Sequence, residues 1–288
     1  MGRRSKNKTG EKVIIFILIL TAVFSASAGE ITAFYISTNA PQNKNLKMVL
    51  QIPAGFSFKD ATNYRVMVLF GGRNWSGEKT IKAYDFVKLA DKHKLFLLSP
   101  SFKNDRYWEP EKWSGKALLQ AINKIKDKYK LNANSKIFYF GYSAGAQCTA
   151  LFYSWKPEIV KAWGAYACGV WFWPKKQVRN AAPAIITCGE DDTQRFLLSK
   201  RFVRQAREHA YSIIWRSYPV GHGLSPKALA LTRSFFASVL SGQSKTKYVG
   251  DDQEMDFYPL KSRNARNVDL EYRNNLPSLN FAQQWKKQ

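Results

Sequence analysis

Ser143 lies between Gly141 and Gly145, in the spacing G-x-S-x-G. An apolar run typical of a buried strand, 135–140, comes before it, and a helical pattern from 146 comes after it. This combination is typical of a nucleophile elbow, a turn so tight that side chains two residues to either side of the serine would clash. The pattern predicts that the Ser143 hydroxyl stands above the end of a strand, at the N-terminus of a helix.

A serine hydroxyl becomes a nucleophile only when a neighbouring base takes its proton, and the base needs an acid to orient it. The chain has three histidines. His93 and His209 fall at the ends of predicted helices, where histidine is common. His222 lies between two glycines in a loop after the last predicted strand, so we expect His222 to be the base.

Three acidic residues, Glu190, Asp191 and Asp192, follow another predicted strand. Together with the elbow and His222 they resemble the α/β-hydrolase superfamily, whose triad has the chain order serine, acid, histidine. In many members the acid stands third after the glycine that ends its strand. The resemblance therefore implies that Asp192 is the acid, and it leaves Asp191 as the alternative.

The negative oxygen that forms during acyl transfer needs two N–H donors. The N–H of Ala144, the residue after the nucleophile, is the first expected donor. Superfamily esterases often carry H-G-x after their third strand, and this chain has Phe70-Gly71-Gly72 there. The resemblance implies that Gly72 supplies the second N–H, with Arg73 as the alternative.

The resemblance extends over about residues 48–242. Within the superfamily the chain looks most like secreted single-domain esterases of the feruloyl-esterase and polyhydroxyalkanoate-depolymerase type. Larger members often insert a cap domain at the connection after Gly169, and only 170–182 is available here. The resemblance implies an open site without a large cap domain.

Aromatic residues are frequent in the loops expected around the site. Their ordinary role is core packing, but loops beside proline and charged residues also suit stacking on a sugar or phenolic ring. The candidates for substrate binding are Trp75, Tyr107, Trp108, Trp171 and Trp173.

Strand and helix patterns alternate along most of the chain, which predicts an α/β fold: a mostly parallel central sheet with helices on both faces. The strands expected are 31–37, 48–52, 64–70, 95–98, 135–140, 162–170, 183–188 and 212–218. The helices expected are 78–94, 115–129, 146–155, 194–210 and 226–240.

The N-terminus has the three parts of a secretory signal: a basic segment to Lys12, an apolar run at Val13–Phe24 and the small residues Ala26-Ser27-Ala28. We expect residues 1–28 to be a signal peptide, with an uncleaved anchor as the alternative. Residues 29–242 would form the hydrolase domain. Residues 243–288 carry scattered large apolar side chains, and we expect this extension to wrap the domain.

Lys and Arg total 45 against 21 Asp and Glu, a net charge of +24. This excess favours attraction to an anionic polysaccharide or a membrane surface. No nucleic-acid-binding motif is present, and a generally basic exported protein is the simpler interpretation. The three cysteines are expected to be buried as small hydrophobic residues. No motif indicates a metal or another cofactor.

The sequence therefore predicts an exported serine hydrolase, most simply a carboxylic ester hydrolase that acts on a small or polymer-linked ester through an acyl-enzyme. Two alternatives stay open: a serine peptidase on the same fold, and a non-catalytic module that binds anionic glycan.

Overall fold

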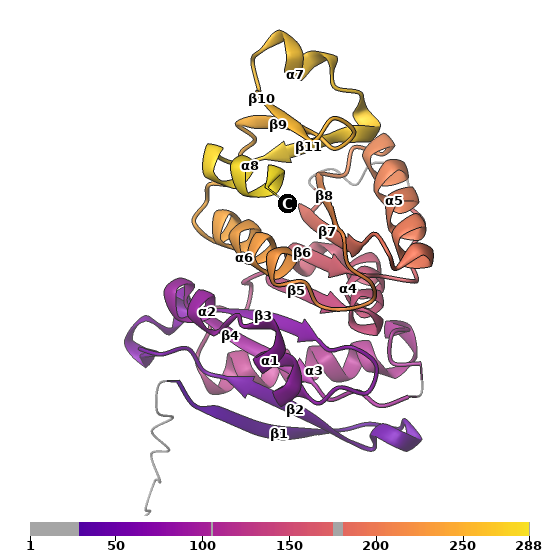
Figure 1. The fold of residues 1–288 in the computed structure, drawn as a ribbon. Coiled ribbons are helices and arrows are strands. Elements are labelled where there is room, and N and C mark those ends of the chain that lie inside the picture. The colour runs from indigo at the N-terminus through magenta and orange to yellow at the C-terminus, as the bar shows by residue number, and fades with distance from the viewer. Residues whose placement is uncertain (1–28, 105, 175–180, 288) are drawn as a thin grey trace, which may run out of the picture.

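The computed structural model describes residues 29–104, 106–174 and 181–287. Its centre is an eight-stranded sheet, in which β3 to β8 run parallel and β1 and β2 are antiparallel additions at one edge (Figure 1). The strands, in their order across the sheet, are β1 (Ile31–Ser37), β2 (Asn45–Gln51), β4 (Leu95–Pro100), β3 (Arg65–Phe70), β5 (Ile137–Tyr142), β6 (Val160–Tyr166), β7 (Ala184–Gly189) and β8 (Ile213–Tyr218).

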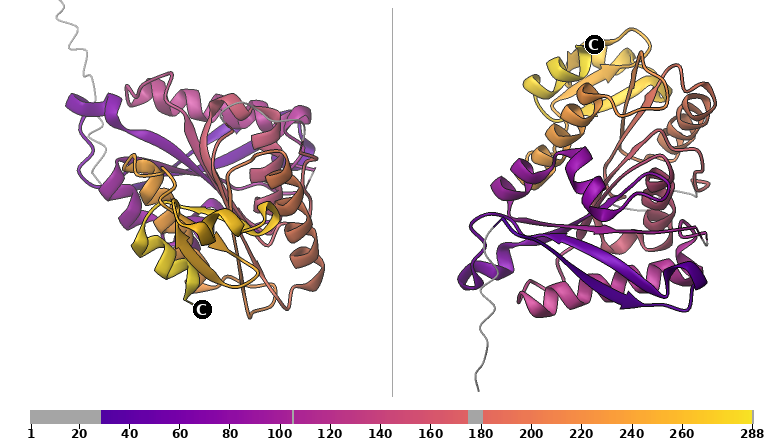
Figure 2. Two further views of the ribbon diagram at one scale, coloured as in Figure 1. Left: turned by 90° about the horizontal axis from the view of Figure 1, so that it is seen from above. Right: turned by 60° about the horizontal axis from the view of Figure 1, so that its bottom comes forward.

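The inner strands are buried along their whole length, because helices cover both faces of the sheet. Helices α1, α2 and α6 pack on one face, and α3, α4 and α5 pack on the other (Figures 1 and 2). Their bounds are α1 (Gly77–Tyr84), α2 (Val87–His93), α3 (Gly115–Lys128), α4 (Ala144–Trp155), α5 (Thr193–Glu208) and α6 (Pro226–Leu240). The predicted α/β architecture is confirmed.

The single helix expected at 78–94 is wrong, since the chain forms two helices there. Asp85 adopts a left-handed conformation with φ of +54° and ends α1. The break lets Tyr84 and Phe86, on either side of it, both be fully buried. In a continuous helix, side chains two residues apart point about 200° away from each other, so only one of the two could face the sheet.

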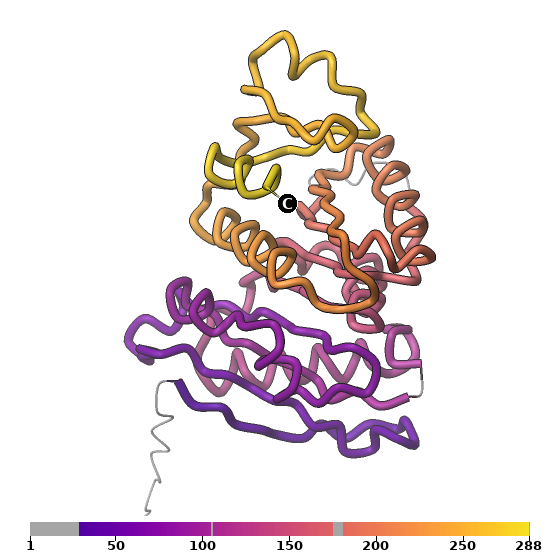
Figure 3. Tube along the Cα trace, in the orientation of Figure 1, coloured from indigo at the N-terminus to yellow at the C-terminus, as the bar shows by residue number. Residues whose placement is uncertain are grey.

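The residues after Gly242 form a unit with regular structure of its own, which the sequence did not indicate. Its three-stranded antiparallel sheet has the order β10-β9-β11, and two short helices accompany it (Figure 1). The yellow end of the trace in Figure 3 follows the chain through this unit. The elements are β9 (Tyr248–Asp251), β10 (Asp256–Pro259), α7 (Arg263–Asn267), β11 (Arg273–Leu276) and α8 (Leu279–Lys286).

This C-terminal extension packs against β8, α5 and α6 at one end of the main sheet. Trp285 is completely buried there, and its indole N–H donates to the Trp215 carbonyl of β8 at 2.8 Å. A buried ion pair, Arg207 with Asp252, joins α5 to the extension at 2.8 Å. The extension therefore shares the core of the domain.

Cys148, Cys168 and Cys188 are free and buried, as expected. The signal peptide predicted for 1–28 lies outside the described residues. Within 29–104, 106–174 and 181–287, no helix has the length and apolar character needed to cross a bilayer.

Candidate active site

Ser143 connects the end of β5 to the start of α4 and has a strained backbone, with φ of +57°. The neighbouring glycines are required by close backbone contacts. A Cβ on Gly141 would stand 2.1 Å from the Gly145 carbonyl oxygen, and one on Gly145 would stand 2.0 Å from that of Phe70. The motif spacing thus has a direct steric cause, and the turn holds the hydroxyl at the carboxyl end of the sheet.

Two buried tyrosines fix this turn from below. The Ser143 N–H donates to the Tyr166 carbonyl of β6 at 2.9 Å. The Tyr84 hydroxyl accepts from the Tyr142 N–H at 3.0 Å and donates to the Phe70 carbonyl at 2.6 Å. The turn is therefore held by hydrogen bonds to two other elements, β6 at Ser143 and α1 at Tyr142, and the Tyr84 hydroxyl links it on to β3.

The structure brings Ser143, His222 and Asp192 into one hydrogen-bonded chain. Ser143 Oγ lies 2.9 Å from His222 Nε2, and His222 Nδ1 lies 2.6 Å from Asp192 Oδ2. Asp192 is 8% exposed, whereas the His222 side chain is 36% exposed. A neutral imidazole with its proton on Nδ1 would donate to the carboxylate and accept the serine proton at Nε2.

The loop that carries His222 is held by two tyrosine hydroxyls. Tyr142 donates to the His222 carbonyl at 3.1 Å, and its ring stacks on the imidazole with centroids 5.2 Å apart. Tyr166 donates to the Gly223 carbonyl at 2.5 Å and accepts from the Ser225 N–H at 2.9 Å. Burial raises the pKa of Tyr166 to about 12, so this hydroxyl stays protonated at neutral pH.

Asp191 lies differently from Asp192. Asp191 is exposed, and its N–H donates to the Val220 carbonyl. The second oxygen of Asp192 accepts from Arg195 at 3.1 Å, one turn into α5. No sequence motif pointed to Arg195, although its i, i+3 spacing to the acid could have indicated it.

The two expected oxyanion donors come from backbone segments that touch. A Cβ added to Gly145 would stand 2.5 Å from the Gly71 carbonyl oxygen, so the loop after β3 lies against the start of α4. Within the described ranges, the N–H groups of Ala144 and Gly72 donate no hydrogen bond to the protein. Neither N–H group is therefore occupied by an acceptor from this part of the protein.

The aromatic candidates lie in different environments. Trp75 is half-buried, with its ring centroid 5.7 Å from that of Tyr142, so Trp75, Tyr142 and His222 form a row of rings. Trp173 is 65% exposed, and Trp108 is half-buried against Tyr107.

The substrate-stacking role expected for Tyr107 has to be corrected. Tyr107 is 2% exposed and stacks on Phe102 in the core, so its ring offers no face to a ligand. Trp171 is half-buried and has one face stacked on Phe202, with centroids 4.2 Å apart. Core packing accounts for these two positions, whereas the Trp75 ring contacts Tyr142, the residue before Ser143.

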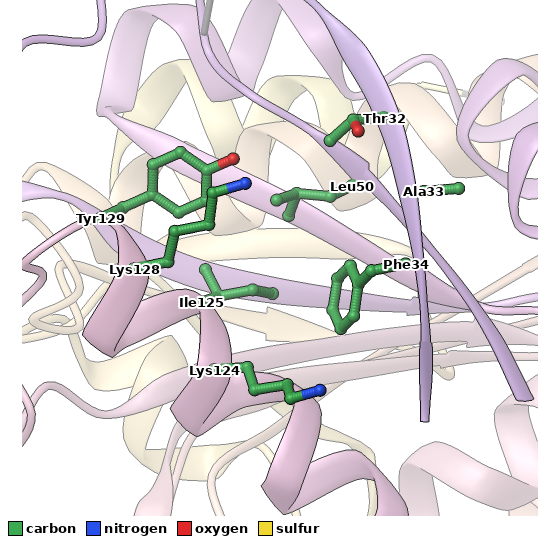
Figure 4. A pocket seen from close by; sticks show the side chains of 8 residues that line it. All are labelled: Thr32, Ala33, Phe34, Leu50, Lys124, Ile125, Lys128 and Tyr129. Carbon is green, nitrogen blue, oxygen red and sulfur yellow. The ribbon is translucent and has the colours of Figure 1, made fainter. Parts of the chain in front are cut away.

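A cavity of about 290 Å³ lies between β1, β2 and α3 (Figure 4). None of Ser143, His222 and Asp192 lines it. The lining residues are Thr32, Ala33, Phe34, Leu50, Lys124, Ile125, Lys128 and Tyr129.

In the part of the chain that the structure describes, no group of three or more histidine, cysteine or acidic side chains could hold a metal ion.

Comparison with solved structures identifies the architecture. A ferulic acid esterase matches with a TM-score of 0.60 at 12% identity, over 74% of this chain and 99% of that one. The chain has the α/β-hydrolase fold. The poly(3-hydroxybutyrate) depolymerase LpqC from Bordetella parapertussis matches with a TM-score of 0.55 at 15% identity, over 73% of this chain and 89% of that one.

A third structure of this fold, the fluorophosphonate-binding serine hydrolase FphF from Staphylococcus aureus, matches with a TM-score of 0.54 at 12% identity, over 75% of this chain and 98% of that one. No family model and no curated protein matches the sequence. At such identities the comparisons establish the fold.

Proposed function

We propose that the protein is a serine hydrolase that cleaves carboxylic esters through an acyl-enzyme. The observation that carries the proposal is the hydrogen-bonded chain from Ser143 through His222 to Asp192. Ser143 lies on an elbow whose flanking glycines allow the tight turn, and the residue is partly exposed to solvent. The solved esterases with the same fold are consistent with this chemistry.

In the first half of the reaction, His222 Nε2 takes the proton of Ser143 as Oγ bonds to the ester carbonyl carbon. The carbonyl oxygen becomes negative and accepts hydrogen bonds from the N–H groups of Ala144 and Gly72. Asp192 holds the imidazole and stabilises its positive form. The tetrahedral intermediate then expels the alcohol, which receives the proton from His222.

In the second half, water attacks the acyl-enzyme. His222 takes a proton from the water, and the new bond forms between the water oxygen and the acyl carbon. Collapse of the second tetrahedral intermediate breaks the bond to Ser143 Oγ and returns the proton to the serine. The acid product leaves, and every group regains its starting protonation.

The substrate enters from an exposed side, because the His222 side chain is 36% exposed and the connection between β6 and β7 is too short for a large cap. We propose that Trp75 contacts the bound ester, since its ring continues the row formed by His222 and Tyr142. An open site of this kind suits an ester carried by a polymer as well as a small one.

The test is hydrolysis of nitrophenyl esters of graded chain length, together with peptide nitroanilides. We expect ester turnover that falls by at least about 10³ in Ser143→Ala, with the melting temperature retained. Turnover of peptides but not esters would instead support a peptidase. Near-normal ester turnover in the folded variant would refute the role of Ser143.

We also propose that the protein is exported, on the basis of the basic, apolar and small-residue sequence of 1–28. Fractionation of expressing cells with N-terminal sequencing tests this. Cytoplasmic protein with an intact N-terminus would contradict it.

A further inference from the structure

Three positively charged side chains lie at the amino ends of the parallel strands, whereas Ser143 lies at their carboxyl ends. Arg65 is the first residue of β3, Lys136 directly precedes β5, and Lys161 is the second residue of β6. These three strands are neighbours in the sheet. Adjacent strands are about 4.8 Å apart, so the three backbone positions span only about 10 Å across the edge.

The three cations border one cavity of about 560 Å³, a size that suits a small ligand. No acidic residue lines it, and its other polar groups are amides and hydroxyls that can donate hydrogen bonds. The neutral polar lining residues are Thr62, Asn63, Asn132 and Ser135.

These cations are not neutralised by the protein itself. Among the described residues, none of Arg65, Lys136 and Lys161 forms an ion pair. The acidic residues nearest in sequence to Arg65 and to Lys161 pair with other cations: Asp60 binds Lys94, and Glu158 lies 3.9 Å from Lys156. An anion entering the cavity would therefore find positive charge without a competing carboxylate.

We propose that this cavity binds a phosphate-bearing anion. A phosphate group offers three acceptor oxygens and close to two negative charges, so three cations placed around it can each form a charge-assisted hydrogen bond. A carboxylate has a single charge and two oxygens in one plane, and satisfies this arrangement less well. The planar guanidinium of Arg65 can bind two phosphate oxygens at once.

The cavity is separate from the proposed active site. Lys136 and Ser143 bracket the six residues of β5, which place the two ends about 20 Å apart. A ligand held here would leave Ser143 facing the opposite way. The site can therefore attach the enzyme to a phosphate-bearing surface without blocking its substrate.

The phosphate could be carried by a soluble compound or by a phospholipid headgroup. The experiment therefore offers the protein both a soluble phosphate compound and a phospholipid surface.

The experiment titrates the full chain with pyrophosphate by calorimetry and with vesicles of phosphatidylglycerol in phosphatidylcholine by co-sedimentation. The test variant is Arg65→Gln with Lys161→Gln. The control is Lys82→Gln with Lys116→Gln, which removes the same charge from exposed sites on α1 and α3. Malonate serves as the carboxylate comparison.

We expect the test variant to bind pyrophosphate at least about 10-fold more weakly, with the control near wild type. Ester turnover should be unchanged in both variants. Loss of vesicle binding in the test variant would assign the site to a headgroup, and unchanged vesicle binding would assign it to a soluble phosphate compound. Absence of pyrophosphate binding, equal weakening in both variants, or malonate binding as tight as pyrophosphate would overturn the proposal.

Discussion

Replacing Asp252 by alanine should destabilise the whole protein, because it removes the only carboxylate that contacts a buried guanidinium within the described ranges. Asp252 Oδ2 accepts from Arg207 at 2.8 Å and from Asn274 at 2.9 Å. The side chains of Arg207 and Asp252 are 2% and 6% exposed. In the variant the buried Arg207 guanidinium keeps only neutral acceptors: the carbonyls of Glu271 and Ile213 and the side-chain oxygen of Asn274.

The expected loss is about 3–5 kcal/mol, the usual cost of leaving one member of a buried pair without its partner. Burial raises the pKa of Asp252 in spite of Arg207, so the intact pair itself adds little net stability. The cost arises mainly from the stranded guanidinium. At about 2 °C per kcal/mol for a chain of this size, the melting temperature should fall by at least about 6 °C.

Asp256→Ala is the matched control, since it removes another aspartate of the same extension. Asp256 binds Lys286 at 2.8 Å, but these side chains are 44% and 49% exposed, which limits the effect to about 0–1 kcal/mol. Thermal and urea denaturation followed by circular dichroism measures both variants. Equal stability of the two, or a separate low-temperature transition of the extension with an unchanged main transition, would refute the integration of the extension into the core.

Three further predictions concern single positions. Asp192→Asn should lower kcat by about 10²–10⁴, because it removes the carboxylate that fixes the His222 tautomer. Asp191 is exposed, so Asp191→Asn should leave kcat nearly unchanged. The reverse order would assign the acid to Asp191. Gly145→Ala should lower the free energy of unfolding by about 3 kcal/mol or more and remove most of the activity, because the new Cβ would stand 2.0 Å from the Phe70 carbonyl oxygen. Gly221→Ala is the control: no atom lies within 4 Å of its new Cβ, so its melting temperature and rate should stay unchanged. Similar behaviour of the two variants would contradict the steric argument. Burial, and after it the neighbouring positive charges, lower the pKa of His93 below its ordinary value of 6.5. The unfolded chain therefore binds a proton that the folded protein does not, so the free energy of unfolding should fall as the pH drops below about 6.5. His93→Gln should flatten that part of the pH–stability curve, and an unchanged slope would exclude His93 as its cause.

The order and type of the main elements could be predicted because parallel strands covered on both faces appear as continuous apolar runs. The break between α1 and α2 could not, since the helical pattern continues through Asp85 and only the packing of Tyr84 and Phe86 requires the turn. The strands of the extension are four residues long, too short to show a period.

At the site, the sequence identified the residues that local spacing marks, such as the serine between its glycines. It did not reveal contacts made across the fold. Tyr142 supports the His222 loop from a position 80 residues away, and Tyr84 supports the turn from another helix. Tyr107 was misplaced for a similar reason, because a tryptophan- and proline-rich loop gives no sign of which ring turns into the core.

The central claim, that Ser143 is an activated nucleophile, is tested most directly by labelling with a fluorophosphonate. The reagent's phosphorus is attacked by serine Oγ with loss of fluoride, and the adduct is located by mass spectrometry of peptides. We predict one equivalent of label on Ser143, none in Ser143→Ala, and much slower labelling in Asp192→Asn. A folded wild-type protein that takes up no label, or takes it up on another residue, would contradict the account.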